Sequence, residues 1–281
     1  MRFKTFLEAK AEDSPKQVYV GLQLNPAPYY LDKYCPDLFW MLVENAPFYR
    51  GMRTENMGVS YVDLTKTTRK SQNTSNWYTE IFDNHFEMAD YPKRSKSLIC
   101  STDLDYAYGF GNQVYVVLPV KNSKIGEVRE LDIWDLDPIE LFGHSGTLDE
   151  INDFLGKIIR LGLNTRECSF QLLRKFDSEI KDESSEVFNR IQHSEYSDLL
   201  DRDDFLNDFL RTILEVYSPD MLGVVSSTPA TFRHAGDQEV WFDTGAIIIP
   251  LYEWRKMRGF LKADSDIKNW QNLLEKIQNE I

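Results

Sequence analysis

The sequence predicts an α+β protein, in which a mixed sheet domain carries an inserted helical block. Runs rich in β-branched and aromatic residues, typical of strands, occur before residue 147 and after residue 223. Between them, residues 147–223 place apolar side chains at helical spacing. We therefore expect three parts. Residues 1–146 and 224–281 form the two portions of one core, and residues 147–223 form the insertion.

The beginning of the chain alternates strand and helix signals. Residues 17–24, QVYVGLQL, alternate enough to suggest a strand, and the PAPYY stretch that follows them reads as a break. A helix is expected after Pro36, because proline suits the first helical turn, and it should end before Pro47. The next stretch, PFYRGM, predicts a short strand.

Further strands are expected before the insertion. Residues 54–75 are rich in Thr, Ser and Asn and indicate loops, whereas residues 76–89 place apolar side chains at helical spacing. The LICST run at residues 98–102 is a compact strand signal. Residues 113–120, QVYVVLPV, give the clearest strand signal in the chain, and residues 128–134 indicate one more.

The insertion and the end of the chain carry their own signals. A T-x-x-E capping box begins at Thr147, and apolar residues of 148–159 share one helical face. A second helical pattern covers residues 204–217. Strand character returns at residues 239–249, and residues 264–281 predict a terminal helix.

Composition limits the class of protein. With 281 residues, 42% hydrophobic and 27% charged, the chain is typical of globular proteins rather than fibrous or disordered ones. It has no apolar run long enough for a membrane span, and its first residues lack the apolar stretch of a signal peptide. Three widely spaced cysteines predict neither a disulfide framework nor a metal site. We expect a cytoplasmic location.

The charge is acidic and uneven. The net charge of −13 disfavours general binding to nucleic acid, because an acidic surface repels phosphate backbones. Residues 47–100 carry 8 basic and 6 acidic residues, a net of +2, whereas residues 148–223 carry 9 basic and 17 acidic residues, a net of −8. The acidic stretch is most simply a solvated helical face. The basic stretch suggests a site for a small anionic ligand.

Three segments carry candidate functional residues. The first contains Arg50 followed by Gly51, and the second ends in Ser101 and Thr102 before the YAYGFG stretch and the strand to Pro119. The third segment, residues 236–242, contains Glu239. In this order they resemble the toxin-like and phage-like mono-ADP-ribosyltransferases, which use an Arg, a Ser and a Glu on three strands around NAD. The resemblance covers roughly residues 40–120 and 225–250, which is under half of the chain.

The resemblance implies a split β-sheet core and NAD as co-substrate. It assigns NAD binding to five residues: Arg50, Gly51, Ser101, Thr102 and Tyr108. It assigns catalysis to Glu239, Asp237 and Ser101. An arginine fork suits phosphate oxygens, and a glutamate stabilises the positive charge that builds on the ribose when nicotinamide leaves. No metal is implied, and no histidine has an i, i+4 partner that would predict a zinc site.

The sequence departs from the family pattern at two positions. Asp103 stands where the family has a third serine, and Asp237 stands where it usually has Glu or Gln. If Asp237 and Glu239 lie on one strand, their side chains share a face, so we expect Asp237 to face the acceptor. Phe232 and Arg233, in the preceding loop, are expected to bind a macromolecular acceptor, for which a protein is favoured over a nucleic acid.

Other interpretations stay open. Arg50 could be an ordinary ion-paired arginine, Ser101 and Thr102 could cap a turn, and Glu239 could face solvent. Two alternative functions therefore remain beside an NAD-dependent ADP-ribosyltransferase. One is a binding or structural module of the same fold that has lost turnover. The other is an unrelated α+β interaction protein whose acidic helical block docks a basic partner.

Overall fold

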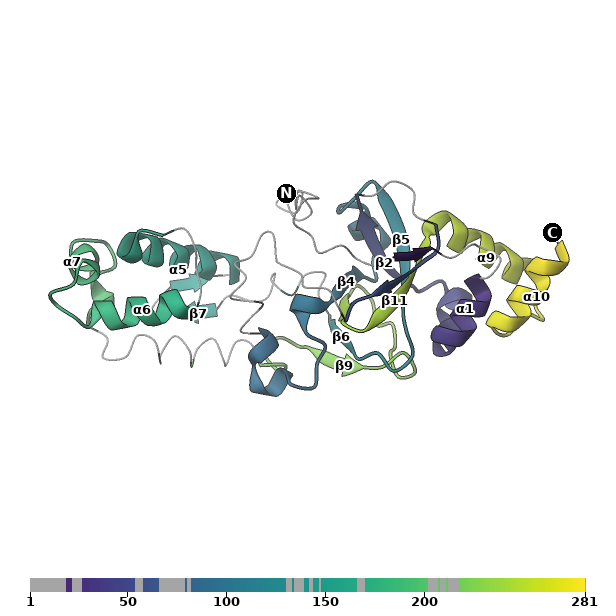
Figure 1. Cartoon of the computed structure of the whole chain (residues 1–281), viewed down its shortest axis with the longest axis horizontal. Helices are drawn as coiled ribbons and strands as arrows, with labels where there is room; N and C mark the ends of the chain where they lie inside the picture. The colour runs from purple at the N-terminus through teal and green to yellow at the C-terminus, as the bar shows by residue number, and fades with distance from the viewer. Residues whose placement is uncertain are drawn as a thin grey trace. The chain divides into compact units, whose positions relative to one another are not determined.

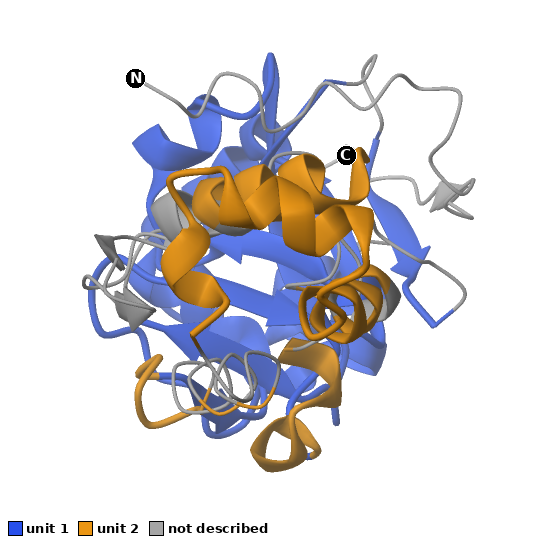
Figure 2. Ribbon diagram, turned by 90° about the vertical axis from the view of Figure 1, so that its left-hand side faces the viewer, with its two compact units in different colours: residues 1–72, 90–131, 224–281 blue, residues 73–89, 132–223 orange. Residues whose placement is uncertain are grey.

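The computed structural model describes residues 19–21, 27–53, 58–65, 79, 82–129, 133, 139–141, 144–146, 148–165, 170–201, 207, 211 and 218–280. The protein is α+β, as the sequence predicts, and it forms two compact units (Figure 2). Unit 1 comprises residues 1–72, 90–131 and 224–281, and unit 2 comprises residues 73–89 and 132–223. The later segment of unit 2 thus begins at residue 132, whereas the insertion was expected from residue 147. Unit 2 also includes the earlier segment 73–89.

Unit 1 contains an antiparallel sheet. In the described residues its strand order is β1-β3-β11-β5-β2-β4-β10-β6-β9. Figure 1 labels β2, β4, β5, β6, β9 and β11 of this sheet. The strands are β1 (Tyr19–Gly21), β2 (Phe48–Met52), β3 (Ser60–Asp63), β4 (Leu98–Ser101), β5 (Gln113–Pro119), β6 (Ile125–Val128), β9 (Val225–Ser227), β10 (Glu239–Phe242) and β11 (Gly245–Pro250).

Most of the expected strands of unit 1 are present, with two corrections. The single strand expected at residues 239–249 is two strands, β10 and β11, which pair with different neighbours. The strand expected at residues 128–134 is β6, which begins at Ile125 and ends at Val128. Of residues 130–134, only Ile133 lies within the described chain.

The sheet is divided between β2 and β4. These strands pair through Tyr49 and Ser101 alone, whereas β2 and β5 pair over five residues. Only Asp243 and Thr244 connect β10 to β11, although three strands lie between them in the sheet order. This link spans at most about 11 Å, whereas four strand spacings in a flat sheet need about 19 Å. The sheet therefore bends strongly, and we call β1-β3-β11-β5-β2 and β4-β10-β6-β9 its two half-sheets.

Helices pack beside the sheet in unit 1. They are α1 (Ala27–Tyr34), α2 (Phe39–Glu44), α4 (Leu104–Tyr108), α9 (Leu251–Ala263) and α10 (Trp270–Glu280), with 3-10 turns at Pro36–Leu38 and Arg94–Lys96. Helix α10 confirms the expected terminal helix, and α2 ends before Pro47 as predicted. Buried Trp270 joins these helices: its Nε1 donates to the Cys35 carbonyl at 3.0 Å, and its ring meets Phe39 edge to face.

Two helices of unit 1 correct the sequence predictions. Residues 27–30 of the PAPYY stretch belong to α1 rather than to a break, because Pro28 lies in the first turn, where a helix needs no N–H donor. Helix α9 was not expected, because it follows β11 directly, without a loop.

Unit 2 is mainly helical in its described part. It contains α5 (Leu148–Leu163), α6 (Phe170–Ile180), α7 (Glu186–Gln192), 3-10 turns at Phe86–Met88 and Ser197–Leu199, and a hairpin of β7 (Ile139–Leu141) and β8 (His144–Gly146). Helix α5 confirms the helix expected from residue 148. Thr147 and nearly all of the pattern at 204–217 lie outside the described residues. Of the helix expected at residues 76–89, the described part is helical at Thr79 and at residues 82–84 and then becomes the 3-10 turn at Phe86–Met88.

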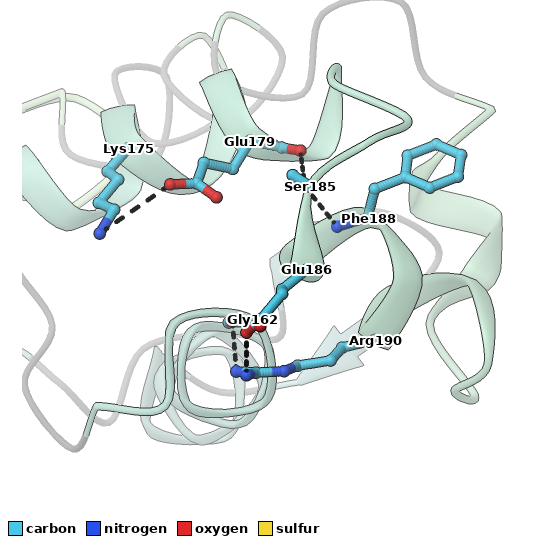
Figure 3. A network of polar contacts seen from close by, with 7 residues as sticks. All are labelled: Gly162, Lys175, Glu179, Ser185, Glu186, Phe188 and Arg190. Carbon is cyan, nitrogen blue, oxygen red and sulfur yellow. Dashed lines mark hydrogen bonds and ion pairs between the residues drawn. The ribbon is translucent and has the colours of Figure 1, made fainter.

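Polar contacts join the three longer helices of unit 2 (Figure 3). The Ser185 hydroxyl accepts from the Phe188 N–H at 2.9 Å, which caps α7, and it donates to the Glu179 carbonyl of α6 at 2.6 Å. Arg190 of α7 pairs with Glu186 at 2.7 Å and donates to the Gly162 carbonyl of α5 at 3.1 Å. Caps of this kind satisfy N–H groups that a helix leaves unpaired.

No helix in the described part of the chain is long and apolar enough to cross a membrane.

Candidate functional site

Arg50, Ser101 and Glu239 lie on the neighbouring strands β2, β4 and β10 of unit 1. Ser101 is the register partner of both Tyr49 and Glu239. Residues paired in this way point to the same face of a sheet, so the Ser101 and Glu239 side chains are neighbours. Arg50 follows Tyr49 on β2 and so starts toward the opposite face.

The Arg50 guanidinium bridges the division in the sheet. The β2–β4 ladder stops after Tyr49 and Ser101, and Nη1 of half-buried Arg50 donates a hydrogen bond to the Ile99 carbonyl on β4. Its remaining N–H groups have no hydrogen-bond partner among the described residues. The side chain therefore ties the two half-sheets together and keeps donors available beside β4.

Glu239 is buried and ion-paired. Arg94 Nη1 donates to Glu239 Oε1 at 2.5 Å, and the two side chains are only 2% and 8% exposed. The other carboxylate oxygen, Oε2, receives no hydrogen bond within the described part of the chain. The sequence left open that Glu239 is a solvent-facing residue, and its burial excludes that interpretation.

Sequence reasoning missed Arg94. This residue lies in a stretch, KRSK, that reads only as basic, and 145 residues separate it from Glu239. Its guanidinium stacks over the Trp241 ring at 4.9 Å from the centroid. Nothing local in the sequence marks either contact, because both depend on the 3-10 turn at Arg94–Lys96 lying beside β10.

Ser101 also positions the next helix. Its hydroxyl oxygen accepts from the Asp103 N–H at 2.9 Å, and Asp103 Oδ1 accepts from the Tyr106 N–H at 2.5 Å. Asp103, which replaces the expected third serine, is therefore the N-cap of α4. The hydroxyl proton of buried Ser101 has no acceptor among the described residues.

The Thr102 hydroxyl is occupied by the backbone, and its expected role in NAD binding stays a prediction. It donates to the Gly236 carbonyl at 2.8 Å and accepts from the Gln238 N–H at 2.8 Å. The Thr102 N–H adds a bond to the Gln238 carbonyl at 2.9 Å. Thr102 therefore fastens the end of β4 to the segment that leads into β10.

Gly51 has a packing role, and its expected role in NAD binding stays a prediction. A Cβ at this position would overlap the Ala107 carbonyl oxygen and lie 2.9 Å from the Gly111 nitrogen. Only glycine lets α4 and the turn after it lie this close to β2. Tyr108, at the end of α4, keeps 49% of its surface exposed, so its ring remains open to a ligand.

Asp237 does not share a strand face with Glu239, which corrects the expectation built on strand alternation. Strand β10 begins at Glu239, and exposed Asp237 lies in a bend after Gly236, whose φ is +104°. The residue between them, Gln238, is buried. Its Oε1 accepts from the Ala235 N–H at 3.1 Å, and its Nε2 donates to Glu127 Oε2 at 3.3 Å.

Phe232 is a core residue, and the expectation that it contacts an acceptor is wrong. Its side chain is fully buried, 4.8 Å from the Phe48 ring in an edge-to-face contact and stacked 6.4 Å from Trp40. The turn residues around it suggested an exposed loop, but the ring points inward. Its neighbour Arg233 is exposed and donates to the carbonyls of Ala230 and Phe232 at 3.2 and 2.6 Å.

The pKa of Cys100, next to Ser101 on β4, is affected by two charged residues of the site. Burial raises the pKa of its thiol to about 12, Arg50 lowers it and Glu239 raises it. Arg50 and Glu239 thus both act on one position of β4, from strands on either side of it. The thiol itself is an inert part of the core.

Neither a metal group nor a known relative assigns a function to this site. The described residues contain no cluster of three or more His, Cys, Asp or Glu side chains that could hold a metal ion. No family model matches the sequence, and neither a curated protein nor a solved structure matches it.

Proposed function

We propose that this protein is an NAD-dependent mono-ADP-ribosyltransferase that modifies a macromolecular acceptor, with a protein favoured over a nucleic acid. One observation carries the proposal: β2, β4 and β10 are adjacent, and Ser101 is paired with both Tyr49 and Glu239. The Ser101 and Glu239 side chains therefore share one face of adjacent strands, and Arg50, which starts toward the opposite face, reaches β4 through its hydrogen bond to the Ile99 carbonyl. The division of that sheet between β2 and β4 also supports an ADP-ribosyltransferase-like fold.

The unpaired groups of the site suit the parts of NAD. The remaining N–H groups of Arg50 are directional donors for the pyrophosphate. Oε2 of Glu239 is an acceptor for a ribose hydroxyl, and the Ser101 hydroxyl proton is a donor near it. The exposed ring of Tyr108 offers a surface on which the nicotinamide can stack.

The proposed chemistry breaks the bond between the nicotinamide nitrogen and the ribose carbon C1′. The bonding electrons leave with nicotinamide, and positive charge builds on the ribose. The Glu239 carboxylate stabilises that charge without moving, which is the electrostatic kind of catalysis. A nucleophile of the acceptor then bonds to C1′, and its proton passes to solvent water. Exposed Asp237 and Arg233 are the residues that we propose for acceptor contact.

A second candidate function is a module of the same fold that binds but does not turn over. The Arg94–Glu239 ion pair favours it, because a cation 2.5 Å from the carboxylate offsets much of the charge that catalysis needs. The two candidates share NAD binding and differ in cleavage.

The test is calorimetry of NAD binding to the purified chain, and incubation with labelled NAD, alone and with a cell lysate, followed by measurement of nicotinamide release and protein labelling. Wild-type protein should show both activities. Glu239→Gln keeps the volume but removes the charge, so turnover should fall about 10²–10³-fold with NAD affinity little changed. Glu186→Gln, the same change on an exposed residue of α7, is the matched control.

Three results separate the possibilities. NAD binding without nicotinamide release in wild type would favour the non-catalytic module. Absence of NAD binding would reject both functions. Wild-type turnover in Glu239→Gln would remove this residue from catalysis.

A further inference from the structure

Arg94 and Glu239 form a buried ion pair that the family resemblance does not account for. We infer that Arg94 is a positioning residue of the proposed reaction, which holds the Glu239 carboxylate in one orientation through Oε1 and presents Oε2 to the ribose. This inference rests on the proposed function. It adds to that function the residue that sets the geometry of the catalytic acid group.

The segment that carries Arg94 is fixed to β10 and to the turn after it. The Lys93 N–H donates to Asp243 Oδ2 at 2.9 Å, and the Trp241 Nε1 donates to the Pro92 carbonyl at 3.0 Å. The Ser97 hydroxyl closes the 3-10 turn by donating to the Lys93 carbonyl at 2.7 Å. The backbone on both sides of Arg94 therefore moves with the strand that carries Glu239.

The guanidinium itself is held against an immobile ring. Trp241 lies directly over Gly126 of β6, where a Cβ would overlap the indole, and the Arg94 guanidinium stacks over that ring. The planar guanidinium suits both the stacking and the hydrogen bond, whereas a lysine ammonium is a point charge without a plane. Arginine is therefore the side chain that fixes the direction of the bond to Oε1.

A fixed carboxylate is what the proposed step requires. A glutamate has three rotatable bonds, and a free one would have to be ordered when the ribose charge develops. Because Arg94 engages one oxygen, the other stays in place for the ribose. Stability alone does not demand this arrangement, since apolar residues often replace buried ion pairs without loss.

The experiment compares Arg94→Lys, Arg94→Met, Glu239→Gln and the double variant Arg94→Met/Glu239→Gln for nicotinamide release from NAD. Rates are expressed per folded protein, measured by circular dichroism. Lys276→Met, which removes the half-buried Asp264 ion pair elsewhere in unit 1, is the control and should leave the rates unchanged.

We expect Arg94→Lys to lower kcat about 10-fold and Arg94→Met about 10²–10³-fold, with KM for NAD within about 3-fold of wild type. The double variant should be no slower than Glu239→Gln, because Arg94 acts through the carboxylate that is already lost. If Arg94→Met does not fold, Arg94→Lys and the double variant, which buries no unpaired charge, still give the answer.

The outcomes separate this inference from the proposed function. A wild-type protein without nicotinamide release overturns both. An active wild type with unchanged kcat in Arg94→Lys overturns the positioning role alone, as does a double variant much slower than Glu239→Gln. A raised KM with unchanged kcat overturns it too, because Arg94 would then contribute to binding only.

Discussion

Two Arg–Glu ion pairs, one in each unit, show how differently the two regions are held together. Arg94 and Glu239 of unit 1 are 2.5 Å apart, 2% and 8% exposed, and separated by 145 residues of chain. Arg190 and Glu186 of unit 2 are 2.7 Å apart, 40% and 85% exposed, and separated by one helical turn. The distances are similar, but the surroundings and the sequence separations are not.

The same contrast extends to the other polar contacts of the two units. In unit 1, Thr102 and Gln238 bond across 136 residues and Lys93 and Asp243 across 150. In the described part of unit 2, most polar contacts are local caps and turns, such as Ser185 to Phe188, and the bond from Arg190 to Gly162 is a longer-range one. Unit 1 therefore depends more on polar partners that meet only when distant segments fold together, whereas the polar contacts of unit 2 are mostly between residues close in sequence.

The largest predicted difference comes from removing the arginine of each pair. Arg94→Met leaves Glu239 buried without its partner and should lower the free energy of unfolding of unit 1 by about 3–5 kcal/mol. Arg190→Met should cost unit 2 no more than about 1 kcal/mol, because its partner is exposed and one backbone hydrogen bond is lost. Hydrogen exchange read peptide by peptide measures each unit separately. Equal losses in the two units would contradict the comparison.

A smaller difference is predicted for one glycine of each unit. Gly51→Ala should destabilise unit 1 by about 1–3 kcal/mol, because the added methyl overlaps the backbone of α4. Gly156→Ala, inside α5, meets no atom within 4 Å and should stabilise unit 2 by about 0.5–1 kcal/mol through helix propensity. The thermal midpoints of the two variants should therefore move in opposite directions. A loss of stability in Gly156→Ala would show that α5 packs more tightly than described.

Elements with a local pattern of apolar residues could be predicted from the sequence. The continuous apolar run of β5 and the one-sided pattern of α5 are local properties, and both elements are present. Helix α9 was missed because Pro250 joins it directly to β11, so the sequence has no loop signal between them. Helix α1 was missed because Pro28 was interpreted as part of a break rather than as part of a first turn.

The candidate site was predictable only as far as motif order reaches. Arg50, Ser101 and Glu239 could be chosen from their segments, and their strands are adjacent. Arg94 could not be found, because its contacts exist only after two distant segments fold together. Phe232 was misassigned for the same reason, since turn residues around it say nothing of the core that its ring enters.

The smallest predicted effects concern pH, and they have opposite signs in the two units. In unit 1, burial raises the pKa of Glu127 above its ordinary value of 4.5, partly offset by the Gln238 hydrogen bond and Arg129. In unit 2, the Ser184 hydroxyl and N–H, at 2.6 and 2.9 Å, lower the pKa of Asp182 below its ordinary value of 3.8. Glu127 thus binds its proton more tightly in the folded protein than in the unfolded chain, and Asp182 binds its proton less tightly.

These directions fix how stability changes with pH. Because the pKa of Glu127 is raised in the folded protein, the ionised carboxylate lowers the free energy of unfolding once the pH rises above 4.5. Glu127→Gln should therefore stabilise unit 1 at pH 7. Because the pKa of Asp182 is lowered in the folded protein, its carboxylate stabilises unit 2 at pH values above 3.8. That stabilisation is lost as the pH falls through the pKa of the folded state. Asp182→Asn should therefore destabilise unit 2 at pH 7. Lowering the pH to about 4 should remove most of the stability difference between Glu127→Gln and wild type, and should leave most of the difference between Asp182→Asn and wild type. Hydrogen exchange of both variants at the two pH values measures this, and differences of the same sign in both units would refute the assignment of causes.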